Sequence, residues 1–343
     1  MTENQFIQEL EQALGRLPAE ERKDIMQDIR EYFANGRADG KSDSTIAAEL
    51  VDPKAIAKEL VDSFDFSQTE VSTLNIDITK DKFDKVDIEI ENGNLVIAPS
   101  PDGQMHVDIA DKNYKQQLTV DIVNRTLVIS LKEEIKLWGI FSITRSMNTP
   151  TLNVQLPDKL YEKIEINSDN GSITGERLAA TVFKLEAENG STHFTHIGAG
   201  SLTANSSNGD VCLTSVQAKQ IEAETENGQL KLHDIQSAKV NVVSANGDIL
   251  LKEVDGEIVA QTDNGRVQLA AAHLDRTIQL ETDNGSILLE AKTEPKNATI
   301  RAEVDWGSIS VFGSKDTKTV FGSGQHPIDL RSDNGSITVK QTD

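Results

Sequence analysis

The sequence contains little cysteine and few aromatic residues: one cysteine in 343 residues, and 4% aromatic side chains. The single cysteine, Cys212, excludes an internal disulfide, and a chain of this length without one favours a reducing compartment. Low aromatic content argues against a sugar-binding cleft, because such clefts use flat rings as stacking platforms. No apolar run approaches the roughly 18 residues of a membrane-spanning helix, so we expect no direct membrane span.

Positive charge is also scarce. The chain has 34 Lys and Arg against 56 Asp and Glu, which gives a formal charge of −22. Binding to DNA, RNA or anionic lipid needs clustered basic side chains that release counterions, and the sequence has no such cluster. We therefore expect no nucleic-acid partner. Glu3 and Glu9 stand where a signal peptide needs a basic start and an apolar run, so we expect a cytoplasmic protein.

Residues 1–66 have the periodicity of a separate helical unit. Phe6, Leu10 and Leu14 recur at helical spacing, and a second helix is expected to end at Asn35-Gly36. The landmarks Leu-Pro-x-x-Glu-Arg, Glu-Tyr-Phe and x-Pro-x-x-Ile-Ala make this segment resemble the HAAS helical domain of bacterial signalling and envelope proteins. In that family the module often precedes membrane spans, and a membrane-anchored role is not carried over to this chain.

The pair Asn-Gly recurs at steps of 18 to 20 residues and then after one step of 50, in which Trp306-Gly307 takes the missing place. The pairs are Asn170-Gly171, Asn189-Gly190, Asn208-Gly209, Asn227-Gly228, Asn246-Gly247, Asn264-Gly265, Asn284-Gly285 and Asn334-Gly335. Apolar residues alternate on both sides of each pair, so we expect short strands with one buried face. A two-residue hairpin at each pair would give an antiparallel meander. We favour a parallel β-solenoid of about 19–20 residues per coil, because a coil this short cannot hold a stable hairpin and its return.

In such a solenoid, Asn and Gly are predicted to be corner residues that tolerate positive φ. Residues 67–165 show the same pattern more weakly, around Asn92-Gly93 and Asn124-Arg125, and are predicted to form an irregular β cap and the first coils. Residues 166–343 are predicted to be the regular solenoid. Residues 136–150 interrupt the pattern. Trp138 and Phe141 within them are expected either to cap the open end of the first coils or to contact a partner.

The strand Val154-Gln155-Leu156-Pro157, followed by repeated Ser/Thr-x-Asn-Gly-x-Ile-x-Leu motifs, resembles a bacterial adhesin-like β-strand-repeat family of unknown function. A HAAS unit followed by such repeats is similar to YvlB-like proteins of Gram-positive bacteria. The resemblance implies an association with the cell envelope or with envelope stress, and it implies no established activity.

No catalytic, cofactor or metal site is predicted from the sequence. Carboxylates stand directly before seven of the corners: Asp169, Glu188, Glu226, Asp263, Asp283, Asp305 and Asp333. Stacked carboxylates could gather divalent cations or raise the pKa of one member for acid catalysis. An acidic residue before Asn-Gly is also a favoured turn opener, and we prefer this interpretation. His193-x-x-His196 lacks a third metal ligand, and Cys212 lacks a basic neighbour to lower its pKa.

Two functions therefore remain open. The first is a non-catalytic scaffold or protein-interaction protein, linked to cell-envelope stress signalling and bound to an envelope-stress or membrane-associated protein. The alternative is an adhesin-like β-helix that binds or cleaves carbohydrate. Low aromatic content favours the scaffold. The sequence leaves the partner's identity and the oligomeric state open.

Overall fold

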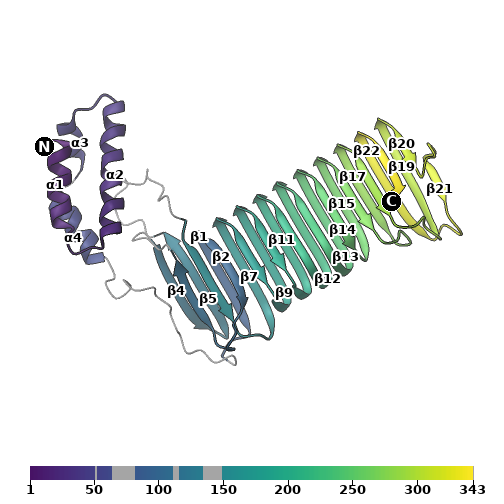
Figure 1. Cartoon of the computed structure of the whole chain (residues 1–343), viewed down its shortest axis with the longest axis horizontal. Coiled ribbons are helices and arrows are strands. Elements are labelled where there is room, and N and C mark those ends of the chain that lie inside the picture. The colour runs from purple at the N-terminus through teal and green to yellow at the C-terminus, as the bar shows by residue number, and fades with distance from the viewer. Residues whose placement is uncertain (51, 64–81, 111–115, 134–148, 343) are drawn as a thin grey trace. The chain divides into compact units, whose positions relative to one another are not determined.

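A computed structural model describes residues 1–50, 52–63, 82–110, 116–133 and 149–342. These residues form two compact units, an N-terminal helical unit and a β unit (Figure 1). No helix in the described part of the chain is long and apolar enough to cross a membrane. The predictions for Trp138 and Phe141 concern residues that lie outside the described ranges.

The helical unit consists of α1 (Glu3–Ala13), α2 (Ala19–Ala38), α3 (Asp43–Glu49) and α4 (Pro53–Ser63). Apolar side chains at helical spacing meet in one buried core, where the rings of Phe6 and Phe33 pack edge to face with centroids 5.8 Å apart. A capping box starts α1: the Thr2 hydroxyl accepts the N–H of Gln5, and the Gln5 side chain accepts the N–H of Thr2.

Helix α2 is longer than predicted, because it continues through Asn35-Gly36. Its stop is Gly40, which has φ of 80°, and the N–H of Lys41 closes the end by donating to the Gly36 carbonyl at 3.0 Å. A Cβ on Gly36 would lie 2.7 Å from side-chain carbons of Ile46, so this glycine provides space for α3 to pack closely against α2. The prediction that Asn35-Gly36 ends the helix is therefore wrong.

The β unit is built from 23 strands in the described residues. The first eleven are β1 (Lys85–Asn92), β2 (Asn94–Pro99), β3 (His106–Ala110), β4 (Gln116–Val123), β5 (Thr126–Glu133), β6 (Thr151–Leu156), β7 (Leu160–Asn170), β8 (Ile173–Glu176), β9 (Ala179–Asn189), β10 (Thr192–Thr195) and β11 (Gly198–Asn208). The others are β12 (Val211–Asn227), β13 (Leu230–Asn246), β14 (Ile249–Val254), β15 (Glu257–Asn264), β16 (Val267–Ala271), β17 (Ile278–Asn284), β18 (Ile287–Ala291), β19 (Ala298–Trp306), β20 (Ile309–Val311), β21 (Lys318–Val320), β22 (His326–Asn334) and β23 (Ile337–Gln341).

Two long parallel sheets run along the β unit (Figure 1). They meet at the Asn-Gly corners, because the strands that lead into these corners end at the Asn of each pair. The first sheet, whose strands lead into these corners, has the order β5, β1, β7, β9, β11, β12, β13, β15, β17, β22, β19. The second sheet has the order β2, β8, β10, β12, β13, β14, β16, β18, β23, β20. Strands β12 and β13 bend at a second corner and contribute to both sheets. The predicted parallel β-solenoid after a small all-α domain is confirmed.

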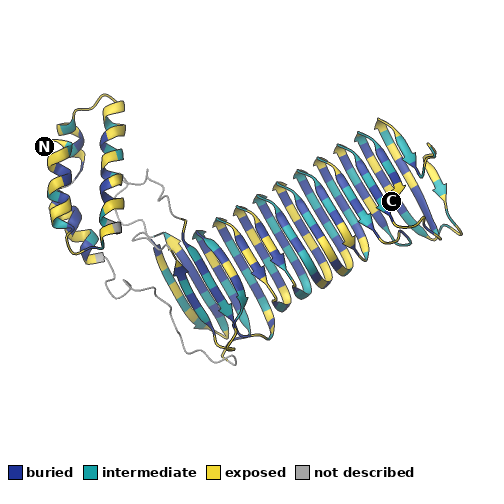
Figure 2. Cartoon of the chain, in the orientation of Figure 1, coloured by how far each residue is buried: buried dark blue, intermediate teal, exposed yellow. Residues whose placement is uncertain are grey.

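The core of the solenoid follows from alternation of burial along most of its strands (Figure 2). Ile221 and Ala223 point inward before one corner, and Leu230 and Leu232 point inward after it; none is more than 2% exposed. Equivalent residues of successive coils pair in register, so each apolar column is buried continuously. Burial of one such Leu or Ile side chain stabilises the fold by about 1.5–3 kcal/mol, and the columns repeat this contribution in every coil.

The C-terminal end of the solenoid does not follow sequence order. Strand β22 pairs in parallel with β17 on one side and with β19 on the other, so Asn334 stacks between Asn284 and Trp306. The sequence spacing had placed Trp306-Gly307 in the gap before Asn334. That order is wrong in space, because the coil of Trp306 is the terminal one. Strand β21 runs antiparallel to the start of β19 and covers that part of its edge.

The N-terminal end of the solenoid also differs from the prediction. Asn124 and Arg125 have φ of 50° and 63°, the left-handed pair typical of a two-residue hairpin turn. The Thr119 hydroxyl donates to the Ser130 carbonyl at 3.5 Å, which fits β4 and β5 folded against each other about this turn. Strand β5 then pairs in parallel with β1. The pair Asn124-Arg125 is thus a hairpin turn beside the first coil. It is not a weaker version of the Asn-Gly corner, as the sequence pattern had suggested.

Candidate functional site: the asparagine ladder and the solenoid surface

The predicted corner asparagines form one continuous chain of hydrogen-bonded amides, which we name the asparagine ladder. The Nδ2 of Asn227 donates to Oδ1 of Asn208 at 3.0 Å, and the Nδ2 of Asn246 donates to Oδ1 of Asn227 at 3.1 Å. The same bond joins all eight residues, at 2.9–3.1 Å: Asn170, Asn189, Asn208, Asn227, Asn246, Asn264, Asn284 and Asn334. Each inner member both donates and accepts, so every Asn side chain depends on its two neighbours.

The glycines of the corners are required by close contact between coils. A Cβ on Gly228 would lie 2.2 Å from the carbonyl oxygen of Gly209, and the other corner glycines, from Gly171 to Gly335, show separations of 1.7–2.1 Å. The N–H of Gly209 donates to the Asn227 carbonyl at 3.0 Å, which pulls the two backbones together. No side chain larger than hydrogen fits at this joint.

Positive φ, which the sequence pattern suggested as the reason for Asn and Gly, explains little of these corners. None of the eight asparagines has positive φ, and among the glycines of the eight pairs it occurs at Gly171 and Gly190. Buried hydroxyls two residues before the Asn complete most corners instead. The Thr225 hydroxyl donates to the Gly209 carbonyl at 3.1 Å, and Thr262, Thr282 and other members of this column repeat the bond.

A second corner, which the sequence pattern did not reveal, lies seven residues after each of the first five ladder asparagines, Asn170 to Asn246. Its residues adopt left-handed backbone with φ of 52–57°: Arg177, His196, Ser215, Asp234 and Glu253. None is Gly or Asn, and only His196 and Asp234 are of types that favour this backbone region. Their shared polar character and their spacing of 19 residues are the signals that could have found them. Adjacent members also bond, since the Ser215 hydroxyl donates to Asp234 at 2.8 Å.

The seven predicted carboxylates lie on the outside, directly beside the asparagine ladder. Parallel pairing brings Asp263, Asp283 and Asp333 into adjacent coils, about 4.8 Å apart per coil, with Asp305 last. Asp333 accepts a bond from the Arg331 guanidinium at 3.3 Å. In the described residues, no group of three His, Cys, Asp or Glu is arranged to hold a metal ion.

On the outside of the second sheet, acidic side chains accept hydrogen bonds from backbone N–H groups and basic side chains of the next coil. Asp248 accepts the N–H of Arg266 at 2.8 Å and its guanidinium at 2.7 Å, and these bonds hold the pKa of Asp248 below its usual range. Burial raises the pKa of the Cys212 thiol in the same sheet, against nucleophilic use. His193 contacts Thr195, while His196 forms the second corner, so the structure does not bring the two histidines to one ligand.

One turn gathers a serine, an aspartate and a histidine. Asp102 accepts the Ser100 hydroxyl at 2.5 Å and the backbone N–H of Gln104 at 2.9 Å, and its carboxylate lies 2.9 Å from Nε2 of His106. These bonds hold the pKa of Asp102 well below its usual range. In a catalytic triad the histidine stands between serine and carboxylate, whereas here the carboxylate is central. The arrangement fixes the turn before β3.

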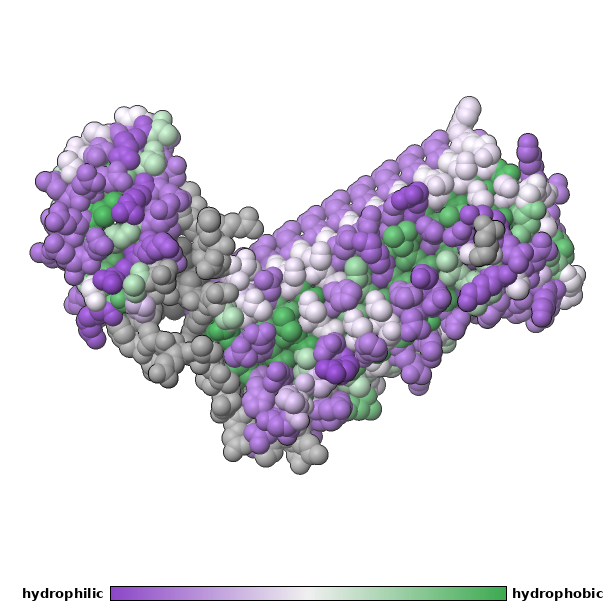
Figure 3. All heavy atoms as spheres, in the orientation of Figure 1, coloured by the Kyte–Doolittle hydropathy of each residue, from purple (hydrophilic) through white to green (hydrophobic). Residues whose placement is uncertain are grey.

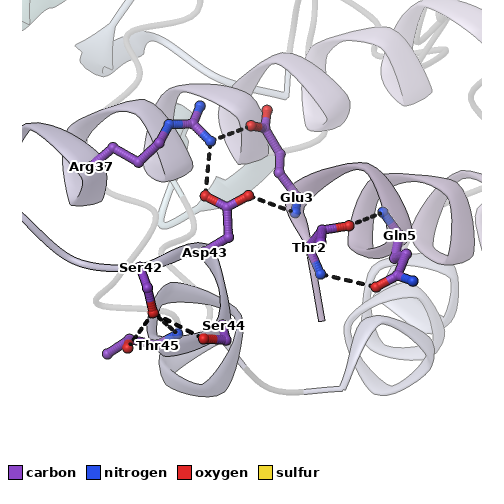
Figure 4. A network of polar contacts seen from close by, with 8 residues as sticks. All are labelled: Thr2, Glu3, Gln5, Arg37, Ser42, Asp43, Ser44 and Thr45. Atoms are coloured by element: carbon purple, nitrogen blue, oxygen red, sulfur yellow. Dashed lines mark hydrogen bonds and ion pairs between the residues drawn. The ribbon is translucent and has the colours of Figure 1, made fainter.

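In the helical unit, a polar network ties α1 to the α2–α3 turn (Figure 4). Arg37 donates to Glu3 at 2.6 Å and to Asp43 at 3.1 Å, and Asp43 accepts the backbone N–H of Glu3 at 3.3 Å. The Glu3 N–H, followed by the Arg37 guanidinium, lowers the pKa of Asp43. The network therefore joins three helices through one carboxylate at the N-terminus of α3.

Comparisons with known proteins agree with this two-part organisation. The Toastrack DUF4097 family model matches residues 83–340, and the HAAS family model matches residues 5–59. These matches confirm the resemblances that the sequence motifs indicated.

Two solved structures are similar to the chain. A candidate adhesin from Bacteroides fragilis shares 15% identity, with 80% of this chain and 98% of that chain covered and a TM-score of 0.44. A candidate cell-adhesion protein from Clostridium sporogenes shares 12% identity over the same fractions, with a TM-score of 0.21. No curated protein matches the chain.

Proposed function

The chain belongs to the Toastrack DUF4097 family, and we propose that it is a non-catalytic scaffold that binds a protein partner. One observation supports this proposal above others: the asparagine ladder and the glycine joint repeat without interruption through eight corners. Outward side chains are thereby held at fixed intervals on a rigid frame. Extended surfaces of this kind are what repeat proteins use for binding.

The surface chemistry supports a partner with a basic face. The chain carries a formal charge of −22, and the outside of the first sheet carries acidic residues beside the ladder. Hydrophobic side chains on the visible face form short patches broken by hydrophilic ones (Figure 3). Electrostatic complementarity would then set partner choice and association rate.

We place this function in the cytoplasm, in a pathway that responds to envelope stress, with the helical unit as the principal contact for an envelope-stress or membrane-associated protein. The HAAS match supports a separate role for the helical unit. Its core of buried apolar residues is independent of the solenoid columns.

Affinity capture with the full-length chain tests the proposal. One variant combines Glu11→Lys and Asp24→Lys on exposed helix positions, and its matched variant combines Asp263→Lys and Asp283→Lys beside the ladder. Both should retain the parent's circular dichroism. We expect the helical variant to lose most of the captured protein and the ladder variant to lose less. Capture of no protein by the parent chain, or equal capture by all three, would contradict the proposal.

Carbohydrate binding is the second candidate, and Trp306 is the observation that favours it. Its side chain is 78% exposed at the end of the asparagine ladder, where a sugar ring could stack on the indole. A single aromatic side chain gives one stacking platform. Calorimetry with soluble oligosaccharides tests this candidate on the parent and on Trp306→Ala. Binding by the parent that Trp306→Ala loses would favour carbohydrate binding over the scaffold.

A further inference from the structure

The terminal coil of the solenoid, residues 298–311, has an open edge. Strand β21 pairs with β19 at Thr299, Ile300 and Arg301, and the Ala302 N–H donates to the Thr317 carbonyl at 2.9 Å. Because backbone groups alternate in direction along a strand, Val304 directs its N–H and C=O toward the same outer edge. No described strand pairs with the outer side of residues 303–310.

The apolar columns are also incompletely covered at this edge. Val304 and Ile309 are half-buried, whereas their equivalents in the neighbouring coil, Ser332 and Ile337, are fully buried. The neighbouring coil covers the edge of every inner coil. The edge of the terminal coil is covered at its two ends, by β21 and Thr317 near Ile300 and Ala302 and by Ser314 at Val311. The end of the core between Val304 and Ile309 thus offers main-chain groups and apolar surface together, which is the requirement for strand addition.

Resting on the proposed interaction function, we infer that this edge binds an extended, basic peptide segment of the partner, which adds as one more coil and carries a glycine opposite Gly307. The peptide needs this glycine because adjacent coils approach each other closely at the glycine joint. At every corner a Cβ would lie within about 2 Å of the adjacent glycine carbonyl, and Gly307 itself approaches Gly335 in this way, since a Cβ on Gly307 would lie 1.7 Å from the Gly335 carbonyl oxygen.

The basic character follows from the charges around the edge. Glu303 and Asp305 point outward on the terminal coil, and Asp333 and Asp283 continue the acidic column into the coils below. Arg331 lies opposite Glu303 and donates to Asp333, so it offsets one of these charges and leaves the others in excess. Trp306, 78% exposed, follows Asp305 on the same terminal coil, so a Lys or Arg side chain drawn to these carboxylates can lie against its ring.

The same charges argue against a second copy of this chain as the occupant. Pairing two terminal coils would bring two sets of Glu303 and Asp305 together, on chains that each carry −22. Like charges across paired strands are destabilising. The N-terminal end of the solenoid is not open in the same way, because β5 pairs along β1 and covers the edge of the first coil there.

The test is fluorescence anisotropy of a labelled synthetic peptide, Lys-Ile-Lys-Val-Lys-Asn-Gly-Lys-Ile-Lys-Val, titrated with the full-length chain. The peptide should bind, and replacement of its glycine by alanine should abolish binding. Asp305→Lys should weaken binding at least about fivefold, whereas the matched change Asp169→Lys, in the same column at the far end, should have little effect. Val304→Pro removes the outward N–H and should also prevent binding while the fold is retained by circular dichroism.

Several results would overturn the inference. These are equal binding of the alanine peptide, equal weakening by the two Asp→Lys variants, or full binding by Val304→Pro. Dimerisation of the parent chain in sedimentation velocity that Val304→Pro abolishes would assign the edge to a second copy instead. If affinity capture of a protein succeeds while no peptide binds, the inference fails and the proposed interaction function stands.

Discussion

Removal of one inner member of the asparagine ladder should cost twice as much as removal of its last member. Asn227→Ala deletes two amide bonds, the one that Asn227 donates to Asn208 at 3.0 Å and the one that it accepts from Asn246 at 3.1 Å. Asn334→Ala deletes the single bond to Asn284, at 3.1 Å. At about 1 kcal/mol net per hydrogen bond, the expected losses of unfolding free energy are about 2 and about 1 kcal/mol.

Urea unfolding of the full chain, followed by the β-sheet signal in circular dichroism, measures these losses. For a domain of this size, 1 kcal/mol lowers the melting temperature by about 2–4 °C, so thermal scans should separate the two variants. Asn205→Ala is the matched control, because Asn205 lies on the outer side of strand β11, away from the ladder. It should change stability by less than about 0.5 kcal/mol.

Equal losses for Asn227→Ala and Asn334→Ala would refute the reasoning, since the two sites differ mainly in the number of amide bonds. A loss no larger than that of Asn205→Ala would show that solvent replaces the ladder bonds without cost. The double variant Asn227→Ala with Asn246→Ala adds a further check. These residues share one bond, so the combined loss should be smaller than the sum of the two single losses.

Three further predictions concern single positions of the solenoid. Gly228→Ala should cost more than about 3 kcal/mol in urea unfolding, because its Cβ would lie 2.2 Å from the Gly209 carbonyl; Gly198→Ala, with 3.9 Å to the nearest atom, should be tolerated. Thr192→Val should raise stability by about 1 kcal/mol, since the fully buried Thr192 hydroxyl has no hydrogen-bond partner in the described residues; a loss would reveal one. Trp306→Asn should extend the asparagine ladder by one member and raise the melting temperature, and an unchanged value would show that the ladder cannot grow outward.

The solenoid itself could be predicted because its determinants are local and repeated. Alternation such as Leu230 and Leu232 after Asn227 defines a strand with one buried face, and a period near 19 residues stacks these strands in parallel. The order of the last two coils could not be predicted in this way. The coils of Trp306 and Asn334 carry nearly the same apolar pattern, so the choice of the terminal one depends on what covers the outer edge. That cover is β21, a short antiparallel strand with no repeat signature.

The physical role of the corner residues also could not be predicted from the sequence. Asn and Gly suggest positive φ, yet the left-handed backbone lies at residues such as Arg177, Ser215 and Glu253, whose types carry no such preference. Glycine is needed because two backbones approach each other, and that distance is a property of stacked coils and not of one coil. The amide bonds between asparagines arise for the same reason.

The asparagine ladder and the glycine joint together explain how this chain tolerates so acidic a surface. A coil displaced by one residue along its neighbour would place a Cβ against a glycine carbonyl and break two amide bonds at the same corner. Register is therefore specified at one edge of each coil, in addition to the buried apolar columns. Outward side chains therefore contribute little to the register, and these positions can carry the excess of carboxylates without loss of the fold. A surface whose side chains can change while their spacing stays constant is suited to recognition, which is the role proposed for this protein.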